Sequence, residues 1–167
     1  MEILIRPARL DDAEHIARIL NQVIESGAYT VLDTLFTVDD ERTFITNFPE
    51  HGVFHVAECS RSRAIHGFQT IEPFSALPTK AFHHVASIGT FIDMEHRRRG
   101  IGARLSETTF EAAKRKGYEK IFTYVRSDNR ASLAFHLKLG FRIIGIAERQ
   151  AKLRGGYVDE VLIEKFL

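Results

Sequence analysis

Apolar residues recur at helical spacing in the first part of the chain. They follow Asp11 and Asp12, which can cap and open a helix, and they stop before Gly27. Their spacing of i, i+3, i+4, i+7 and i+8 places them on one stripe of a helix. The stripe consists of Ile16, Ile19, Leu20, Val23 and Ile24.

Weaker apolar spacing, together with capping and terminating residues, predicts three further helices. They span Thr37–Phe48, Gly100–Lys116, and a short segment that begins at Asp128 or Asn129 and ends at Leu139. Pro49, Gly117 and Gly140 follow these segments, where proline and glycine commonly end helices.

Runs of apolar and β-branched residues, bounded by turn residues, predict seven strands. They are Glu2–Arg6, Val53–Cys59, Ile65–Ile71, His83–Ile92, Ile121–Val125, Phe141–Glu148 and Val158–Phe166. The order is therefore β-α-α-β-β-β-α-β-α-β-β. Hairpins early in the chain and a βαβ unit later predict one α/β domain over residues 1–167, with a mixed, mostly antiparallel sheet of about seven strands flanked by four helices. Gly89 lies inside a predicted strand, which indicates a bulge there.

The bulk composition is typical of a globular protein. Of 167 residues, 44% are hydrophobic and 27% are charged, and the formal net charge is +1. So small a charge provides no broad basic surface for nucleic acid or an anionic membrane. Cys59 is the single cysteine, which excludes an internal disulfide, and no apolar run reaches the roughly 18 residues of a membrane span. The charges at Glu2 and Arg6 interrupt any signal-peptide core, so we expect a cytoplasmic protein.

A short basic turn connects the strand that ends at Ile92 to the helix that begins at Gly100. It carries three arginines, Arg97, Arg98 and Arg99. The first turn of a helix offers N–H groups without partners and a positive dipole end, and Gly100 and Gly102 would let a phosphate approach the main chain. Arginine adds forked donors that suit phosphate oxygens. The turn therefore predicts a polyanion site, with a solvated basic helix start as the alternative.

Two motifs together indicate a family. Arg97-x-x-Gly100-x-Gly102 resembles the acetyl-CoA pyrophosphate loop of the GNAT superfamily of N-acetyltransferases. One helix and one strand later, the segment from Asn129 to Phe141 resembles the second hallmark of that superfamily, an Asn followed by a helix that closes in an aromatic-x-x-Leu-Gly-Phe run. Other short matches along the chain look most like the phosphinothricin-acetyltransferase-like branch, whose members acetylate the α-amine of amino-acid-like compounds.

The resemblance implies an acetyl-CoA site and a GNAT-type fold. The main chain of Thr90, Phe91 and Ile92 would pair with the pantetheine arm like an added strand. Amides from Arg98 through Gly100, Ile101 and Gly102 to Ala103 would hold the pyrophosphate. Asn129 would contact the pantetheine region, although Asn also favours a plain N-cap role. The resemblance further implies a homodimer, and no metal is expected.

His136 stands where most of the superfamily has a tyrosine, and the phosphinothricin-like branch often has histidine there. Because helix positions seven apart differ by about 20°, Asn129 and His136 share one helix face. We hypothesise that His136 protonates or hydrogen-bonds the sulfur of CoA. The alternative is a packed histidine with one nitrogen hydrogen-bonded.

The general base is less clear. The branch usually has a glutamate in the fourth strand, where this chain has Ser87. The candidates that remain are Glu72 and His84, with His83 and Tyr124 behind them, and each can equally be structural or solvated. A regular pleat places His84 on the face opposite Ser87. An acceptor amine of low pKa, or a water relay, would reduce the need for a carboxylate.

Tyr29 and Phe36 lie between the first two predicted helices, where we expect the acceptor pocket. A small-molecule amine is the favoured acceptor. The alternatives are the N-terminus of a protein, such as a ribosomal protein, and a CoA-binding sensor without catalysis. RNA binding through the arginine turn is disfavoured because the chain lacks aromatic platforms and a broad basic surface.

Overall fold

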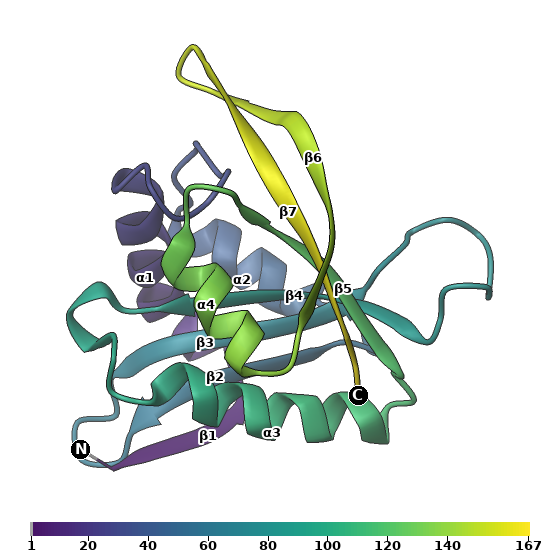
Figure 1. The fold of residues 1–167 in the computed structure, drawn as a ribbon. Helices are drawn as coiled ribbons and strands as arrows, with labels where there is room; N and C mark the ends of the chain where they lie inside the picture. Colours follow the sequence, from purple (N-terminus) through teal and green to yellow (C-terminus); the bar gives the residue numbers. More distant parts are fainter. Residues whose placement is uncertain (1) are drawn as a thin grey trace.

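The computed structural model describes residues 2–167 and contains a seven-stranded sheet (Figure 1). Its strands are β1 Ile3–Pro7, β2 Val53–Cys59, β3 Ile65–Pro73, β4 Val85–Ile92, β5 Lys120–Arg126, β6 Arg142–Leu153 and β7 Gly156–Phe166. They lie in the order β1-β2-β3-β4-β5-β7-β6, and only β4 and β5 run parallel. The predicted fold class and element order are confirmed. The last two strands are longer than predicted because they pair with each other far beyond the sheet core.

Helices cover both faces of the sheet (Figure 1). They are α1 Ala13–Glu25, α2 Val38–Thr46, α3 Ile101–Arg115 and α4 Arg130–Lys138, with short 3-10 turns η1 Leu10–Asp12 and η2 Met94–His96. α1 and α2 pack on one face, and α3 and α4 lie on the other. The predicted stripe of α1 is buried in full. Within residues 2–167, none of these helices has the length and apolar character needed to cross a membrane.

Side-chain caps fix where the helices begin. Thr37 accepts a hydrogen bond from the amide of Asp40, and Asn129 accepts one from the amide of Ser132, as expected for N-caps. Asp12 differs from its expected role. It lies just before α1, but its carboxylate accepts from the amide of Arg9 and from Arg6. Asp12 therefore caps the preceding 3-10 turn.

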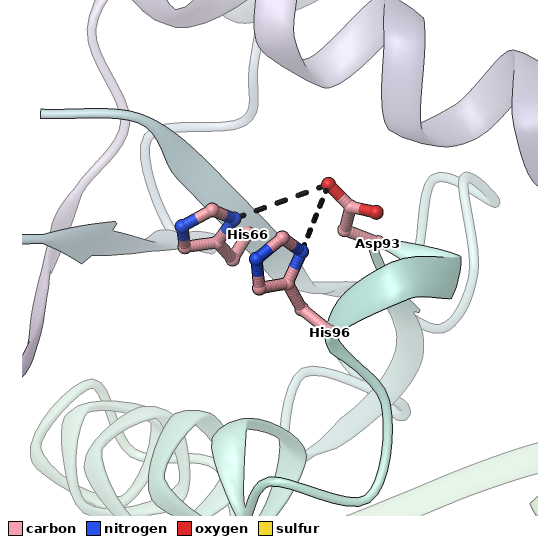
Figure 2. A group of neighbouring side chains, drawn as sticks. All are labelled: His66, Asp93 and His96. Carbon is pink, nitrogen blue, oxygen red and sulfur yellow. Dashed lines mark ion pairs between the residues drawn. The ribbon is translucent and has the colours of Figure 1, made fainter. Parts of the chain in front are cut away.

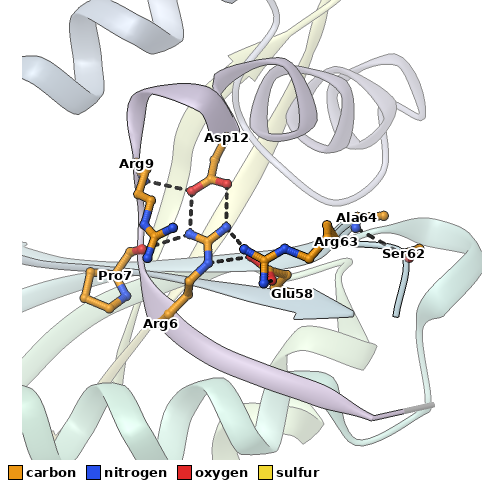
Figure 3. A network of polar contacts seen from close by, with 8 residues as sticks. All are labelled: Arg6, Pro7, Arg9, Asp12, Glu58, Ser62, Arg63 and Ala64. Atoms are coloured by element: carbon orange, nitrogen blue, oxygen red, sulfur yellow. Dashed lines mark hydrogen bonds and ion pairs between the residues drawn. The ribbon is translucent and has the colours of Figure 1, made fainter. Parts of the chain in front are cut away.

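Arg6 joins three parts of the fold (Figure 3). Its guanidinium donates to both carboxylate oxygens of Asp12, at 2.8 Å each, and to Glu58 of β2. Both carboxylates are buried, with Glu58 at 1% exposure, and the exposed Arg63 also pairs with Glu58. Burial is the largest single influence and would raise the pKa of Asp12, but the hydrogen bonds from Arg6 and from the Arg9 amide, together with the charges of these two arginines, outweigh it and hold that pKa below its usual value.

β4 and β5 separate soon after they meet. They pair only at Val85 with Lys120 and at Ala86 with Ile121, and beyond these positions the strands diverge. The register of β4 with β3 continues unbroken from Ala86 to Ile92, so the bulge expected at Gly89 is absent from that pairing. The edge of β4 that faces β5 is therefore open over its second half. This opening lies in the middle of the sheet and positions the site.

Candidate active site

A cavity occupies the opening between β4 and β5. Its walls come from both faces of the sheet. On the face of α3 and α4 it is lined by Asn129, Ser132 and His136, and on the face of α1 and α2 by Tyr124, Arg126 and Glu160 together with residues 29–31. Ile88, Gly89, Thr90 and Phe91 of β4 form the edge between them. Two molecules that enter from opposite faces can meet here.

Unpaired main-chain groups flank this cavity along β4. Thr90 is fixed from the side of α3, because its Oγ1 accepts a hydrogen bond from Gln69 at 2.8 Å, and Gln69 also donates to Ser106 of α3. Phe91 points to the other face, where its ring stacks on Phe68. With its side chains held on both faces, this edge of β4 is a rigid template for an extended ligand.

The basic turn leads into α3 with the geometry expected of an anion site. Gly100 is the N-cap of α3 and has φ +77°, a left-handed conformation that favours glycine. The N-cap provides no side-chain acceptor, and the first turn of α3 has no acidic residue. A Cβ built on Gly100 would meet no atom within 4 Å. The first-turn amides of Ile101, Gly102 and Ala103 have no acceptor within the helix and lie at the positive end of its dipole, next to the open space at Gly100.

Gly102 is needed for a different reason. A Cβ at Gly102 would lie 3.1 Å from two ring carbons of Phe135, the residue before His136 in α4. The missing side chain therefore lets α3 and α4 approach closely. Both helices then present their N-terminal parts to the same side of the opening.

The loop after α1 closes the other side of the cavity and is tied to the basic turn. The guanidinium of Arg97 lies 4.1 Å from the centre of the Tyr29 ring. The side-chain amide of Asn129 donates to the carbonyl of Tyr29 at 3.1 Å. Arg126 donates to the carbonyls of Gly27 and Thr30, and it pairs with Asp128. Arg98 and Arg99 stay exposed at the surface of the turn.

A second polar cluster fixes the start of the turn (Figure 2). Asp93, 3% exposed, accepts from Arg18 of α1 at 2.9 Å and from the amide of Glu95 at 3.1 Å. The Nδ1 atoms of His96 and His66 lie 3.5 and 3.9 Å from the same Asp93 oxygen. Burial is the largest single influence and would raise the pKa of Asp93, but the hydrogen bonds from Arg18 and the Glu95 amide, together with the charges of Arg18 and His96, outweigh it and lower that pKa. Burial also lowers the pKa of His66.

The three groups of this cluster have the residue types of a metal site, and their ligand atoms lie within 4.8 Å of one another. Two features oppose a shared ion. Arg18 already neutralises the Asp93 oxygen that both rings face. The two imidazoles are also stacked, with centroids 3.7 Å apart and planes at 24°, so one ion in the plane of one ring lies out of the plane of the other. We therefore interpret the cluster as an anchor between α1 and the basic turn.

His136 is buried, and its tautomer follows from its partners. Its Nδ1 lies 2.8 Å from the carbonyl oxygen of Ser132, which can only accept, so Nδ1 carries the hydrogen. Nε2 is left with a lone pair for a ligand. Burial lowers the pKa of His136, and the Ser132 hydrogen bond offsets this only in part. The imidazole is therefore mainly neutral at pH 7, and it acts as a proton donor only after it has taken up a proton.

The structure places Ser87, Glu72 and His84 outside the residues that line the cavity. Ser87 is opposite Glu72 in the β4–β3 register, so the two side chains share a face, but neither lines the cavity. His84 precedes β4 and is exposed, and its carbonyl accepts from the amides of Glu119 and Lys120 at the end where β4 and β5 are paired. Phe36 is fixed through its main chain by Asn21 and packs in the core near α1. Of the two residues predicted for the acceptor pocket, Tyr29 alone lines the cavity.

Two acidic residues were missed from the sequence. Glu160 of β7 lines the cavity at 4% exposure, and burial raises its pKa. Glu41 of α2 is 3% exposed, and burial with the nearby Asp40 charge raises its pKa to about 7. For Glu160 the available signal was a carboxylate next to the apolar run Val161–Ile163, whereas Glu41 stands among other charged residues and has no such signal. Many such residues are paired or solvated, and the sequence does not show which ones lack a partner.

Comparison with known proteins gives a consistent family. The family model described as an acetyltransferase (GNAT) domain matches residues 5–162. A phosphinothricin N-acetyltransferase of Streptomyces coelicolor is 25% identical over 166 residues, which cover 98% of this chain and 96% of that protein. An L-methionine sulfoximine/L-methionine sulfone acetyltransferase of Pseudomonas aeruginosa is 26% identical over 82 residues, covering 49% of this chain and 48% of that protein.

Solved structures support the fold. A GNAT superfamily phosphinothricin acetyltransferase from Sinorhizobium meliloti, in complex with acetyl-CoA, superposes with a TM-score of 0.90 at 20% identity and covers 100% of this chain and 89% of that chain. A ribosomal-protein-alanine N-acetyltransferase from Brucella melitensis gives 0.89 at 23% identity, covering 98% and 99%. At these identities the likeness establishes the fold and leaves the acceptor open.

Proposed function

The chain belongs to the GNAT family of acetyltransferases, and from this premise we propose that it transfers the acetyl group of acetyl-CoA to the primary α-amine of an amino-acid-like small molecule, of phosphinothricin or methionine sulfone type. The observation that carries the proposal is the cavity in the β4–β5 opening, which is lined from both faces of the sheet. The named activities of the relatives favour the same acceptor class.

The residues present fit acetyl-CoA. The pyrophosphate would lie over the amides of Ile101 to Ala103, where Gly100 leaves the approach open. The pantetheine arm would extend along the free edge of β4 at Thr90 to Ile92, beside Asn129. When bound, acetyl-CoA supplies an acyl group already activated as a thioester. A main-chain N–H of β4 would polarise its carbonyl.

Residues on the two faces would then have separate tasks. Tyr29 and Tyr124 line the acceptor side, and the loop that carries Tyr29 is fixed by Asn129 and Arg126. His136 lies on the CoA side with Nε2 available to hold a proton near the departing sulfur. The loop between α1 and α2 is held over the opening by these hydrogen bonds, which favours a small acceptor over a protein N-terminus. The cytoplasmic location and the homodimer stay predictions.

The test is an acceptor screen. The purified protein is mixed with acetyl-CoA and a panel that contains phosphinothricin, methionine sulfone, methionine sulfoximine, common amino acids and a peptide with a free N-terminus. Thiol release and product mass are measured, and a reaction without acceptor gives the background. We expect N-acetylation of an amino-acid-like compound and none of the peptide. Peptide acetylation would favour the ribosomal-protein type, and cofactor binding without turnover on any amine would favour a sensor.

A further inference from the structure

Glu160 is a buried carboxylate without a counter-ion. Among the side-chain hydrogen bonds and ion pairs described for residues 2–167, none involves its carboxylate; the residue is 4% exposed, and its carboxylate oxygens are not among the fully enclosed unpartnered atoms. It is also the one acidic residue among those that line the cavity. Holding an unpaired carboxylate mostly away from water costs free energy. At this position the natural compensation is a cationic ligand.

The neighbouring groups explain why Glu160 has no partner. Arg126 is directly opposite Glu160 in the β5–β7 register, but four of its five N–H donors bond to Asp128 and to the carbonyls of Gly27 and Thr30, and none of the described ion pairs joins it to Glu160. On its other side Glu160 is opposite Ala147 of β6, which has no charge. The other titratable groups at the cavity are Tyr29, Tyr124 and His136, and burial keeps His136 mainly neutral.

Glu164 shows what an ordinary acidic residue does on the same strand. It lies four residues after Glu160 and on the same face, since side chains alternate along a strand. It pairs with Lys120 at 2.5 Å and with Arg142. The hydrogen bond from Lys120, followed by that from Arg142, lowers the pKa of Glu164, whereas burial raises that of Glu160. Glu160 is thus left free on the acceptor side of the opening.

We propose that Glu160 is the general base of the acetyl transfer and the group that attracts the acceptor as an ammonium ion. This inference rests on the proposed function. A proton passes from the ammonium nitrogen to a Glu160 carboxylate oxygen. The freed lone pair forms the C–N bond at the thioester carbonyl carbon. The C–S bond then breaks, its electron pair leaves with sulfur, and the thiolate takes up the second proton, which the acylated nitrogen releases as the amide forms. The glutamate absent from β4 at Ser87 is thereby replaced from β7.

The other acidic candidates are less well placed. Glu72 shares a face with Ser87 but does not line the cavity. Glu41 is buried on α2 and does not line it either. The cavity contains the main-chain edge of β4 at Gly89 to Phe91 and the carboxylate of Glu160, so the electrophile and the base would share one space.

The experiment compares Glu160→Gln with wild type, on the acceptor that the screen identifies. Glu148→Gln, an exposed glutamate of β6, is the matched control. We expect Glu160→Gln to reduce kcat/KM by about 10²- to 10⁴-fold at pH 7. The loss should shrink as pH rises towards the amine pKa, because free amine then no longer needs a base. Acetyl-CoA affinity, measured by calorimetry, should be unchanged, and Glu148→Gln should behave as wild type.

Folding is checked by thermal unfolding, and Glu160→Asp provides a second variant with a retracted carboxylate and an intermediate rate. A folded Glu160→Gln variant with a wild-type pH–rate profile overturns the inference and leaves the proposed function standing. So does a loss of the same size at every pH, which would indicate a structural or binding role. Absence of turnover by wild type on every amine refutes the proposed function itself, and the inference with it.

Discussion

The proposed anion site at the start of α3 can be tested by substituting two glycines that have similar backbone geometry, only one of which lies at that site. Gly100 and Gly117 flank the same helix, with φ of +77° and +88°, and a Cβ at either position meets no protein atom within 4 Å. Alanine at each position should therefore cost the same, about 1–2 kcal/mol for the left-handed backbone. For a chain of this length that lowers the unfolding temperature by about 2–8 °C.

The two variants should differ in cofactor binding. If the pyrophosphate lies against the main chain at Gly100, the added methyl group displaces it from at least one amide. A hydrogen bond to a charged group contributes about 1.5–3 kcal/mol, which corresponds to a loss of about 10- to 100-fold in CoA affinity. Gly117→Ala, at the far end of α3, should bind CoA like wild type.

The assay is calorimetric titration of CoA into both variants, below their unfolding temperatures. Dephospho-CoA, which lacks the 3′-phosphate but keeps the pyrophosphate, should be weakened by Gly100→Ala to the same extent as CoA. Equal affinities for the two variants would refute the main-chain cradle. The pyrophosphate would then have to be bound by the exposed arginines of the turn without the main-chain amides.

Further predictions concern the supports of the site and the fold. Arg6→Ala leaves Asp12 and Glu58 buried without their shared cation and should cost about 3–5 kcal/mol in urea unfolding, whereas Arg63→Ala at an exposed position should cost less than about 1. The pKa of Asp12 is lower in the folded than in the unfolded state. The ionised carboxylate therefore stabilises the fold above the unfolded-state pKa, and this contribution is lost as pH falls through the folded-state pKa. We expect the stability of Asp12→Asn to depend less on pH than that of wild type below about pH 4, as measured by acid unfolding. Asn129→Ala removes the cap of α4 and the bond to Tyr29, with an expected loss of about 1 kcal/mol and a higher KM for acetyl-CoA; Asn129→Asp should recover the stability and leave KM raised. Glu160→Gln should unfold at the same temperature as wild type or higher at pH 7, because the folded-state pKa of Glu160 is raised and its ionisation destabilises the fold; a marked drop in that temperature would show that the carboxylate has a partner.

Local patterns in the sequence were sufficient for the fold and for the local backbone geometry of the proposed cofactor side. The stripe of α1, the caps at Thr37 and Asn129, and the glycine at position 100 each depend on residues within a few positions of one another. Such signals are local, so they can be interpreted without knowing the tertiary structure.

The acceptor side could not be predicted in the same way, because its residues come from distant parts of the chain. Glu160 and Tyr29 line one cavity although they are far apart in sequence. Whether Glu160 or Glu164 is the free carboxylate depends on where Lys120, Arg126 and Arg142 direct their charges. Arg126 donates hydrogen bonds to the loop after α1, and only the tertiary structure shows this contact between residues far apart in sequence.

The proposed cofactor side and the proposed acceptor side of the site meet where β4 diverges from β5. A parallel pair that stays hydrogen-bonded would seal the sheet, and His136 on one face could not share a space with Glu160 on the other. Because pairing stops after Ala86, a proton acceptor on β7 can serve a thioester held at β4 without either strand leaving its place. In the proposed mechanism the base comes from β7, which is separated from β4 by β5 in the sheet, because β4 itself provides only Ser87. In this proposal the base is therefore identified by its place at the opening between β4 and β5, and the position of the base in the sequence does not identify it.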